Sequence, residues 1–300
     1  MTWKKQGDHI ILSVPSDFSF TQNLHYLKRS TNECLFHIQN NKVRKAITVG
    51  EYTTLVEISE RDDHTLAIRF LVDGPCPEEQ VVAYIIDWFD LKTVIQPFYN
   101  MAKNDDVLQQ SVIEFYGLRI MGIPDLFEAM AWGILGQQIN LTYAYTLKRR
   151  LVEKFGQSIE FEGQQYWVFP KPHDISKLTV EDLVELKMTV KKCEYLIDVA
   201  SQIANGSLTK EMLLDTNDIK IAEKILTNIR GIGPWTANYV LMRCVRFASA
   251  FPIDDVGLHN AIKHVIGSEQ KPSKDKIIQL SQHWKGWEAY ATFYLWRFLY

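Results

Sequence analysis

The sequence is poor in the features that mark membrane and secreted proteins. None of its apolar runs approaches the roughly 18 uninterrupted residues that a membrane-spanning helix needs. Near the start of the chain, Gly7, Asp8 and His9 stand where a secretory signal carries its apolar stretch. We therefore expect a cytoplasmic protein.

Cysteine is also scarce, which limits the metal and disulfide chemistry open to the chain. Four cysteines are spread over 300 residues, at positions 34, 76, 193 and 244. They are too few and too scattered for a disulfide framework or for a four-thiolate zinc or iron–sulfur site. We expect them to be small core residues.

The chain lacks the excess of positive charge that a broad nucleic-acid-binding surface requires. Its 33 Lys and Arg stand against 36 Asp and Glu, which gives a net charge of -3. Residues 1–110 carry 11 basic and 15 acidic residues, so residues 111–300 carry 22 and 21. If the protein binds a polyanion, it does so through local geometry.

The length and the pattern of apolar residues predict two domains. Between residues 34 and 72, short β-branched runs alternate with polar turns, which is typical of antiparallel strands, and residues 78–89 have the apolar spacing of a helix. After about residue 104 the strand signal almost vanishes. We predict an α+β N-terminal domain with an antiparallel sheet at residues 1–110, followed by an all-α module at residues 111–300. The helices predicted in this module span residues 124–135, 141–155, 180–186, 191–204, 218–229, 235–247, 256–266, 273–283 and 285–300.

The most informative stretch lies between two of these helices. One helix ends at Ile229 to Arg230, Gly231 and Gly233 bracket a single residue, and Pro234 is suited to start the next helix. The glycines permit a turn that β-carbons would forbid, and they leave backbone N–H groups exposed at a helix N-terminus. Such amides hold a phosphate without a basic side chain, which fits the charge balance. Taken alone, the two glycines could also serve only to end one helix and begin the next.

Two adjacent carboxylates follow about twenty residues later, at the start of another helix. Pro252 and several apolar residues precede Asp254 and Asp255, which suggests a buried approach to the pair. An aspartate at such a position commonly caps the helix, and two adjacent ones cannot both do so. We assign the cap, or another structural role, to Asp254 and the chemistry to Asp255, although the spacing alone leaves the choice nearly even.

Together these segments resemble the helix-hairpin-helix DNA glycosylase superfamily. The stretch from Leu226 to Ala237 is similar to its hairpin, and Phe251-Pro-Ile-Asp-Asp255 is similar to the loop that carries its aspartate. Within the superfamily, the chain most resembles the bacterial inducible 3-methyladenine DNA glycosylases. The resemblance covers about residues 110–300, while the strand-rich pattern before them is compatible with the family's small α+β domain. Supporting segments are Ile134-Leu-Gly-Gln-Gln138, Phe169-Pro-Lys-Pro172, Ala204-Asn-Gly-Ser-Leu208 and Trp284-Lys-Gly-Trp-Glu-Ala-Tyr-Ala291.

The resemblance implies that Asp255 is catalytic and that Gly231, Gly233 and Thr236 contact the DNA backbone. Bifunctional members carry a lysine two positions after the second glycine, where this chain has Trp235, and an indole cannot form a Schiff base. Members with an iron–sulfur cluster carry four close cysteines after the aspartate, and this chain has no cysteine there. The resemblance therefore implies a monofunctional glycosylase with no metal and no other cofactor.

The resemblance also implies a pocket for the damaged base and a residue that wedges into the DNA. Trp235 and Tyr239 lie four residues apart and so share one helix face; with Trp296 they would form the base pocket, where electron-rich rings attract a cationic base. Each of the three could instead be an ordinary core residue. Gln138 stands at the wedge position, where related enzymes carry an apolar residue. Its alternative role is to cap a helix together with Gln137.

We therefore predict a monomeric enzyme that flips alkylated purines, such as 3-methyladenine and 7-methylguanine, out of double-stranded DNA and hydrolyses their N-glycosidic bond in base excision repair. Its expected location is the bacterial nucleoid, with no membrane partner. Two alternatives are a non-catalytic helix-hairpin-helix DNA-binding protein and a glycosylase for oxidised purines. The aspartate with aromatic residues near it disfavours the first alternative, and Trp235 in place of lysine disfavours the second.

Overall fold

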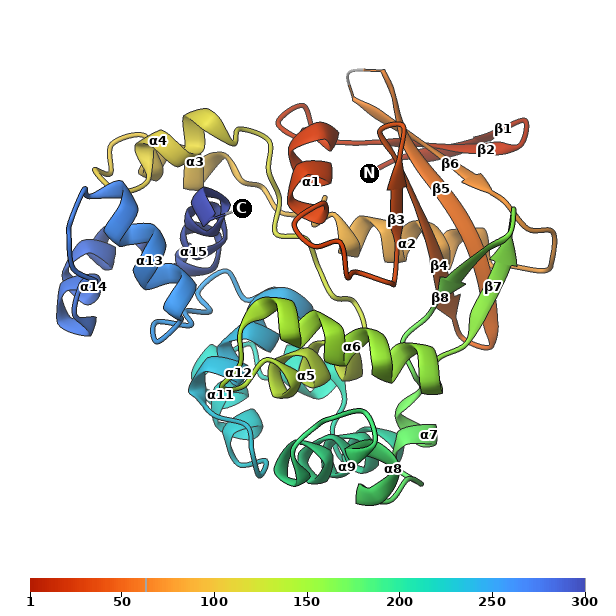
Figure 1. Cartoon of the computed structure of the whole chain (residues 1–300). Helices are drawn as coiled ribbons and strands as arrows, with labels where there is room; N and C mark the ends of the chain where they lie inside the picture. Colours follow the sequence, from red (N-terminus) through yellow and green to blue (C-terminus); the bar gives the residue numbers. More distant parts are fainter. Residues whose placement is uncertain (63, 300) are drawn as a thin grey trace.

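An antiparallel six-stranded sheet dominates the first part of the chain in the computed structural model, which describes residues 1–62 and 64–299 (Figure 1). The strand order is β1-β2-β6-β5-β4-β3. The strands span Trp3–Gln6 (β1), His9–Ser13 (β2), His37–Gln39 (β3), Lys42–Val49 (β4), Tyr52–Asp62 (β5) and Thr65–Phe70 (β6), and the accompanying helices span Phe20–Leu27 (α1) and Glu78–Trp88 (α2).

The sheet and α2 share a hydrophobic core, as the apolar patterns predict. Ile47 and Ile58 from the sheet are buried in the same cluster as Val82 and Ile85 from α2. The antiparallel strands and the helix predicted between residues 34 and 89 are therefore confirmed. Strands β1 and β2 were not predicted. Strand β1 could not be recognised from its apolar pattern, because all four of its residues are exposed and apolar and polar residues do not alternate in it.

Helices make up most of the remaining chain, which confirms the predicted fold class. The predicted helices correspond to α5 (Leu126–Leu135), α6 (Leu141–Phe155), α8 (Val180–Val184), α9 (Val190–Ala204), α11 (Ile219–Thr227), α12 (Pro234–Val240), α13 (Val256–Val265), α14 (Lys274–Leu280) and α15 (Glu288–Trp296). Four shorter helices were not predicted: α3 (Gln96–Ala102), α4 (Gln109–Glu114), α7 (Pro172–Ile175) and α10 (Lys210–Asp215). No helix in the described residues is long and apolar enough to cross a membrane.

A two-stranded hairpin corrects the prediction that residues 111–300 are entirely helical. Strands β7 (Ser158–Phe161) and β8 (Gln164–Trp167) are joined by Glu162 and Gly163, both with positive φ. The hairpin buries Tyr166 against Ala46 and Leu55 of the large sheet. A hairpin this small is marginal alone, so its pattern is weak in the sequence, and packing on the sheet stabilises it.

The boundary between the N-terminal part and the helical part is less sharp than a division at residue 110 suggests. Helices α3 and α4 precede that residue or span it, yet they lie beside α15 (Figure 1). The hydroxyl groups of Tyr99 in α3 and Tyr294 in α15 are 2.8 Å apart. The division into residues 1–110 and 111–300 therefore stays a prediction.

Candidate active site

The turn between α11 and α12 has the geometry that its two glycines predict, but the glycines have different roles. Gly231 has φ +86°, and a β-carbon there would lie 2.3 Å from the Tyr195 ring. Its carbonyl accepts a 2.8 Å hydrogen bond from Gln137 Nε2. Gly233 is exposed, and a β-carbon there would meet nothing within 4 Å. Gly231 therefore shapes the turn, and Gly233 is the glycine whose surface is open to a ligand.

The first turn of α12 leaves amides outside the helical hydrogen-bond ladder. Gly233 is the N-cap residue, and its carbonyl accepts from Ala237 N–H at 3.0 Å, so the ladder begins there. The N–H groups of Trp235 and Thr236 come before that bond and therefore have no acceptor within the helix. The whole Thr236 residue is only 2% exposed, and its methyl group faces Gly133, where a β-carbon would lie 2.4 Å away. Neither its hydroxyl group nor its backbone is therefore appreciably exposed, and a contact of Thr236 with the DNA backbone stays a prediction.

The two neighbouring aspartates have roles that differ from the prediction. Asp255, not Asp254, is the N-cap of α13, because its Oδ1 accepts from Leu258 N–H at 2.7 Å. Asp254 is exposed and forms an ion pair with Lys274 at 2.8 Å. The assignment of the cap to Asp254 is therefore wrong. Asp255 caps the helix with one oxygen and still presents its carboxylate to the aromatic residues that were predicted to surround it.

Two tryptophans hold the Asp255 carboxylate. Trp235 Nε1 donates to Oδ2 at 2.8 Å, and Trp296 Nε1 donates to Oδ1 at 2.8 Å. Together with the cap, these bonds occupy three of the roughly four acceptor positions of a carboxylate. Among the described residues nothing occupies the fourth position, which lies on Oδ2. The half-buried carboxylate is thus fixed in orientation, and one of its acceptor positions takes no hydrogen bond from the described residues.

The close approach of Trp296 to Asp255 depends on a glycine. A β-carbon on Gly257 would lie 2.8 Å from Asp255 Oδ1 and 3.3 Å from Trp296 Nε1. The φ angle of Gly257 is not in the left-handed region, so other residues could adopt its backbone conformation. The absence of a side chain at this position is therefore needed for space and not for backbone freedom.

The structure brings together the three aromatic residues predicted for the base pocket. The rings of Trp235 and Tyr239 stack with centroids 5.4 Å apart and an interplanar angle of 21°. The Tyr239 and Trp296 centroids are 6.4 Å apart. Trp235 is half-buried, whereas Tyr239 and Trp296 are 4% and 6% exposed. Trp235 is thus the ring of this aromatic wall with the most surface available to a ligand.

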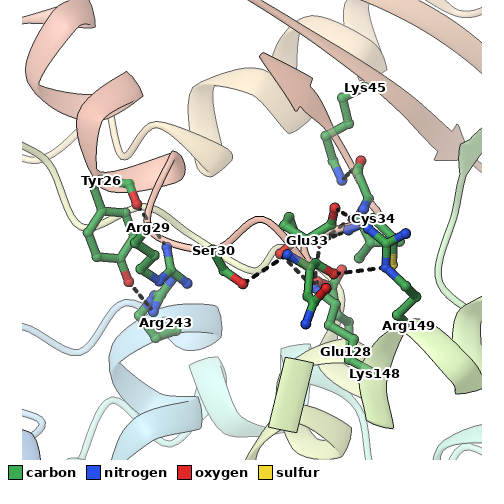
Figure 2. A network of polar contacts seen from close by, with 12 residues as sticks. Tyr26, Arg29, Ser30, Glu33, Cys34, Lys45, Glu128, Lys148, Arg149 and Arg243 are labelled. Carbon is green, nitrogen blue, oxygen red and sulfur yellow. Dashed lines mark hydrogen bonds and ion pairs between the residues drawn. The ribbon is translucent and has the colours of Figure 1, made fainter. Parts of the chain in front are cut away.

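A buried arginine, Arg243, lies against the aromatic wall and was not predicted from the sequence. Its Nη1 donates to the hydroxyl groups of Tyr26 and Tyr239, both at 3.0 Å, and Figure 2 shows it facing Tyr26. In the sequence, its position four residues after Tyr239 on a continuing helix indicated that the two side chains share a helix face. The helix is wider there, with π-type turns over Leu241–Val245, a distortion that often occurs at functional sites.

A second group of buried charges joins the N-terminal part to the helical part (Figure 2). Lys148 of α6 contacts Glu33 at 3.1 Å and Glu128 of α5 at 3.4 Å. Burial alone would lower the pKa of Lys148, but the two carboxylates outweigh it and raise the pKa. Burial would likewise raise the pKa of Glu33, but the charge of Lys148 lowers it below its ordinary value. Both groups are therefore charged at neutral pH.

Gln138 projects from the turn between α5 and α6. It is exposed and has φ +56°, an uncommon conformation for a residue with a side chain. The neighbouring Gln137 is half-buried and bonded to Gly231. Neither side chain caps α6, because Asn140 does so by accepting from Tyr143 N–H at 2.8 Å. The capping alternative for the two glutamines is therefore wrong, and the exposed position of Gln138 is compatible with a wedge.

The chain is similar to known base excision DNA repair proteins. Residues 131–286 match the family model described as "HhH-GPD superfamily base excision DNA repair protein", and residues 11–130 match "8-oxoguanine DNA glycosylase, N-terminal domain". The chain is 52% identical over 304 residues to "DNA-3-methyladenine glycosylase" of Bacillus subtilis (strain 168), with 100% of both chains covered. It is 27% identical over 253 residues to "DNA-3-methyladenine glycosylase 2" of Escherichia coli (strain K12), covering 84% of each. The solved "3-methyladenine dna-glycosylase from Archaeoglobus fulgidus" has the same fold, with a TM-score of 0.82, 22% identity, and 96% of this chain and 97% of that chain covered.

Proposed function

Because the chain belongs to the HhH-GPD superfamily of base excision DNA repair proteins, we propose that it is a monofunctional DNA glycosylase that releases alkylated purines, such as 3-methyladenine and 7-methylguanine, from double-stranded DNA. The observation that carries the proposal is the Asp255 carboxylate, held by two indole N–H groups with one acceptor position open. The B. subtilis relative, named as a DNA-3-methyladenine glycosylase, supports the lesion class.

The chemistry needs one negative charge in a fixed place. When the bond between C1′ and the base nitrogen breaks, the bonding electrons leave with the base and positive charge develops on the sugar. Asp255 stabilises that charge, and its Oδ2 orients the water molecule whose oxygen bonds to C1′. Oδ2 accepts the proton that this water gives up and passes it on to solvent. A cationic alkylated base leaves as a neutral molecule, so the reaction needs no strong general acid.

The DNA contacts proposed for the enzyme lie around this carboxylate. The exposed turn at Gly233 and the first amides of α12 bind a backbone phosphate, and Gly231 keeps the turn in shape. Gln138 enters the base stack when the damaged base is flipped out, which offsets part of the cost of unstacking. We propose that the enzyme acts as a monomer at the bacterial nucleoid.

The first experiment compares the two neighbouring aspartates on duplexes that each contain one alkylated purine. Asp255→Asn removes the charge but keeps a good helix-capping side chain, so it should fold and bind DNA while base release falls on the order of 10²–10³-fold. Asp254→Asn is the matched control, because it removes only a surface ion pair and should retain the wild-type rate. Wild-type base release by Asp255→Asn, or none by the native protein, would refute the proposal.

A second measurement tests the monofunctional chemistry. Strand cleavage needs an amine that forms an imine with C1′, and Trp235 has no usable lone pair on its indole nitrogen. The product should therefore be an intact strand with an abasic site, which breaks only after alkali treatment. Borohydride should trap no protein on the DNA. A stoichiometric adduct would mean that a lysine, such as Lys191 or Lys263, reaches the sugar.

A further inference from the structure

Asn238 of α12 links three segments around the candidate site. Its side-chain Nδ2 donates to Glu223 Oε1 of α11 and to the carbonyl of Pro234, both at 3.0 Å. Its Oδ1 accepts from the backbone N–H of Phe251 at 3.0 Å. Because the residue is 7% exposed, these bonds form a buried link between α11, the start of α12 and the loop that leads to Asp255.

The three partners of Asn238 require a side chain that both donates and accepts. The Glu223 carboxylate and the Pro234 carbonyl can only accept, whereas the Phe251 N–H can only donate. An aspartate has the same shape and would accept from Phe251, but it has no hydrogen to donate. It would also place a second negative charge beside Glu223. Since buried polar groups without a partner are costly, this position calls for an amide.

The loop from Phe251 to Asp255 is too compact to absorb a shift at its start. Ile253 N–H donates to the carbonyl of Phe251 at 2.8 Å, and Asp255 N–H donates to the carbonyl of Pro252 at 2.9 Å. His259 Nε2 of α13 donates to the carbonyl of Ile253 at 2.9 Å and so holds the middle of the loop. A displacement of Phe251 would therefore be passed on to Asp255.

Both ends of this loop are attached to α12. Asn238 holds the backbone of Phe251 at the start of the loop. Trp235, three residues earlier on the same helix, donates to Asp255 Oδ2 at the end of the loop, at 2.8 Å. The same helix begins at the exposed turn of Gly233, the site proposed for a DNA phosphate. One helix thus fixes the distance between that turn and the carboxylate.

We propose that Asn238 is a positioning residue of the glycosylase reaction, which sets where the Asp255 carboxylate stands relative to the bound DNA. It acts through Asp255 and not by contact with the base or the sugar. The inference rests on the proposed glycosylase function and deepens it by identifying how the carboxylate is aligned with its substrate. Misplacement of a reacting group by about 1 Å slows a reaction on the order of a hundredfold.

The test measures single-turnover base release from an alkylated duplex with the enzyme in saturating excess, so that the rate reports the chemical step. Asn238→Asp keeps the shape and the acceptor but loses both donated bonds, and base release should slow on the order of tenfold to a hundredfold. Adding Glu223→Gln supplies a donor to Asp at this position and restores the wild-type total charge. The double variant should therefore recover most of the rate.

An NMR measurement separates positioning from a general loss of stability. The indole N–H signals of Trp235 and Trp296 report their bonds to Asp255, and single Trp→Phe variants assign them. In Asn238→Asp, the Trp235 signal should move toward its position in Asp255→Ala. In the double variant with Glu223→Gln, it should return toward its wild-type position.

Asn23→Asp is the matched control for damage to the fold. Asn23 of α1 is also buried, and its Nδ2 donates to the carbonyls of Ser19 and Gly117. Its Oδ1 accepts from the backbone N–H of Arg119. The same substitution there should lower the free energy of unfolding but leave the base-release rate and the Trp235 signal unchanged.

Glu223→Ala keeps the inference testable if Asn238→Asp does not fold. Glu223 is half-buried, and its removal takes one acceptor from Asn238, so the rate should fall by a smaller factor and the Trp235 signal should move in the same direction. A wild-type rate or an unmoved Trp235 signal in folded Asn238→Asp would overturn the positioning role. If that variant does not fold, either result in Glu223→Ala would do so. Failure of the native protein to release an alkylated base would instead refute the proposed function.

Discussion

Gly257→Ala is the change that most directly tests how the active site is held together. The added β-carbon would lie 2.8 Å from Asp255 Oδ1 and 3.3 Å from Trp296 Nε1, so the carboxylate and the indole must move apart. The bond at risk is a hydrogen bond to a charged group, which contributes about 1.5–3 kcal/mol. If all of it acts on the transition state, base release should slow by about tenfold to a hundredfold.

The same substitution should change the stability of the fold only modestly, because two local effects oppose each other. Alanine is favoured over glycine in a helix by up to about 1 kcal/mol, and Gly257 lies in the first turn of α13 with an ordinary φ angle. Against this gain, the displaced Oδ1 is also the cap that accepts from Leu258 N–H, and loss of a cap costs about 0.5–2 kcal/mol, so we expect the free energy of unfolding in urea to fall by no more than about 2 kcal/mol. Val256→Ala, at an exposed neighbouring position, is the control and should leave the base-release rate unchanged.

The assay is single-turnover base release from an alkylated duplex, with urea unfolding measured on the same preparations. A double variant with Trp296→Phe, which removes the indole donor, adds a check. If Gly257→Ala acts through the bond between Trp296 and Asp255, the double variant should be no slower than the slower single variant. A Gly257→Ala protein with the wild-type rate would refute the argument, and so would fully additive losses in the double variant.

Three further predictions concern other parts of the molecule. Gly233→Val should weaken binding to damaged and undamaged DNA alike, measured by fluorescence anisotropy, because the side chain fills the open space at the turn and phosphate contacts carry little sequence information. Gln138→Ala should slow base release from a duplex more than from a single strand, since only the duplex leaves a gap to fill. Glu33→Gln should lose about 1.5–3 kcal/mol of unfolding free energy at pH 7, because Lys148 loses one of its two carboxylate partners and keeps Glu128. The pKa of Glu33 is lowered below its ordinary value of 4.5, so the wild-type advantage should be full above that pH and shrink as the pH falls below it; an advantage that persists in acid would contradict this.

Local chemistry explains which parts of the site were predictable. A turn is predicted by the local residue types alone at Gly231, Gly233 and Pro234. Helix geometry alone places Trp235 and Tyr239 on one face. The choice between Asp254 and Asp255 depended on the backbone torsions of the loop and on two indoles, one of them forty-one residues away in the sequence. Either aspartate suits a cap, so the residue types could not decide it.

Contacts that are distant in the sequence explain what was missed. Tyr26 and Arg243 are 217 residues apart, and neither lies in a motif that marks a partner. The spacing of Arg243 from Tyr239 was visible, but it does not reveal that the charge is buried without a carboxylate. The hairpin of β7 and β8 was missed for a related reason, since its stability comes from residues more than a hundred positions earlier.

The hairpin of β7 and β8 has a consequence for how the molecule unfolds. Tyr166 crosses from the helical part to cover Ala46 and Leu55, while Tyr26 crosses in the other direction to hold Arg243. Each part thus completes the other's interior, and a fragment cut near residue 110 would expose apolar surface on both halves. Melting of the sheet and melting of the helices should accordingly be one cooperative event, and a truncated fragment would be expected to aggregate when it is expressed alone.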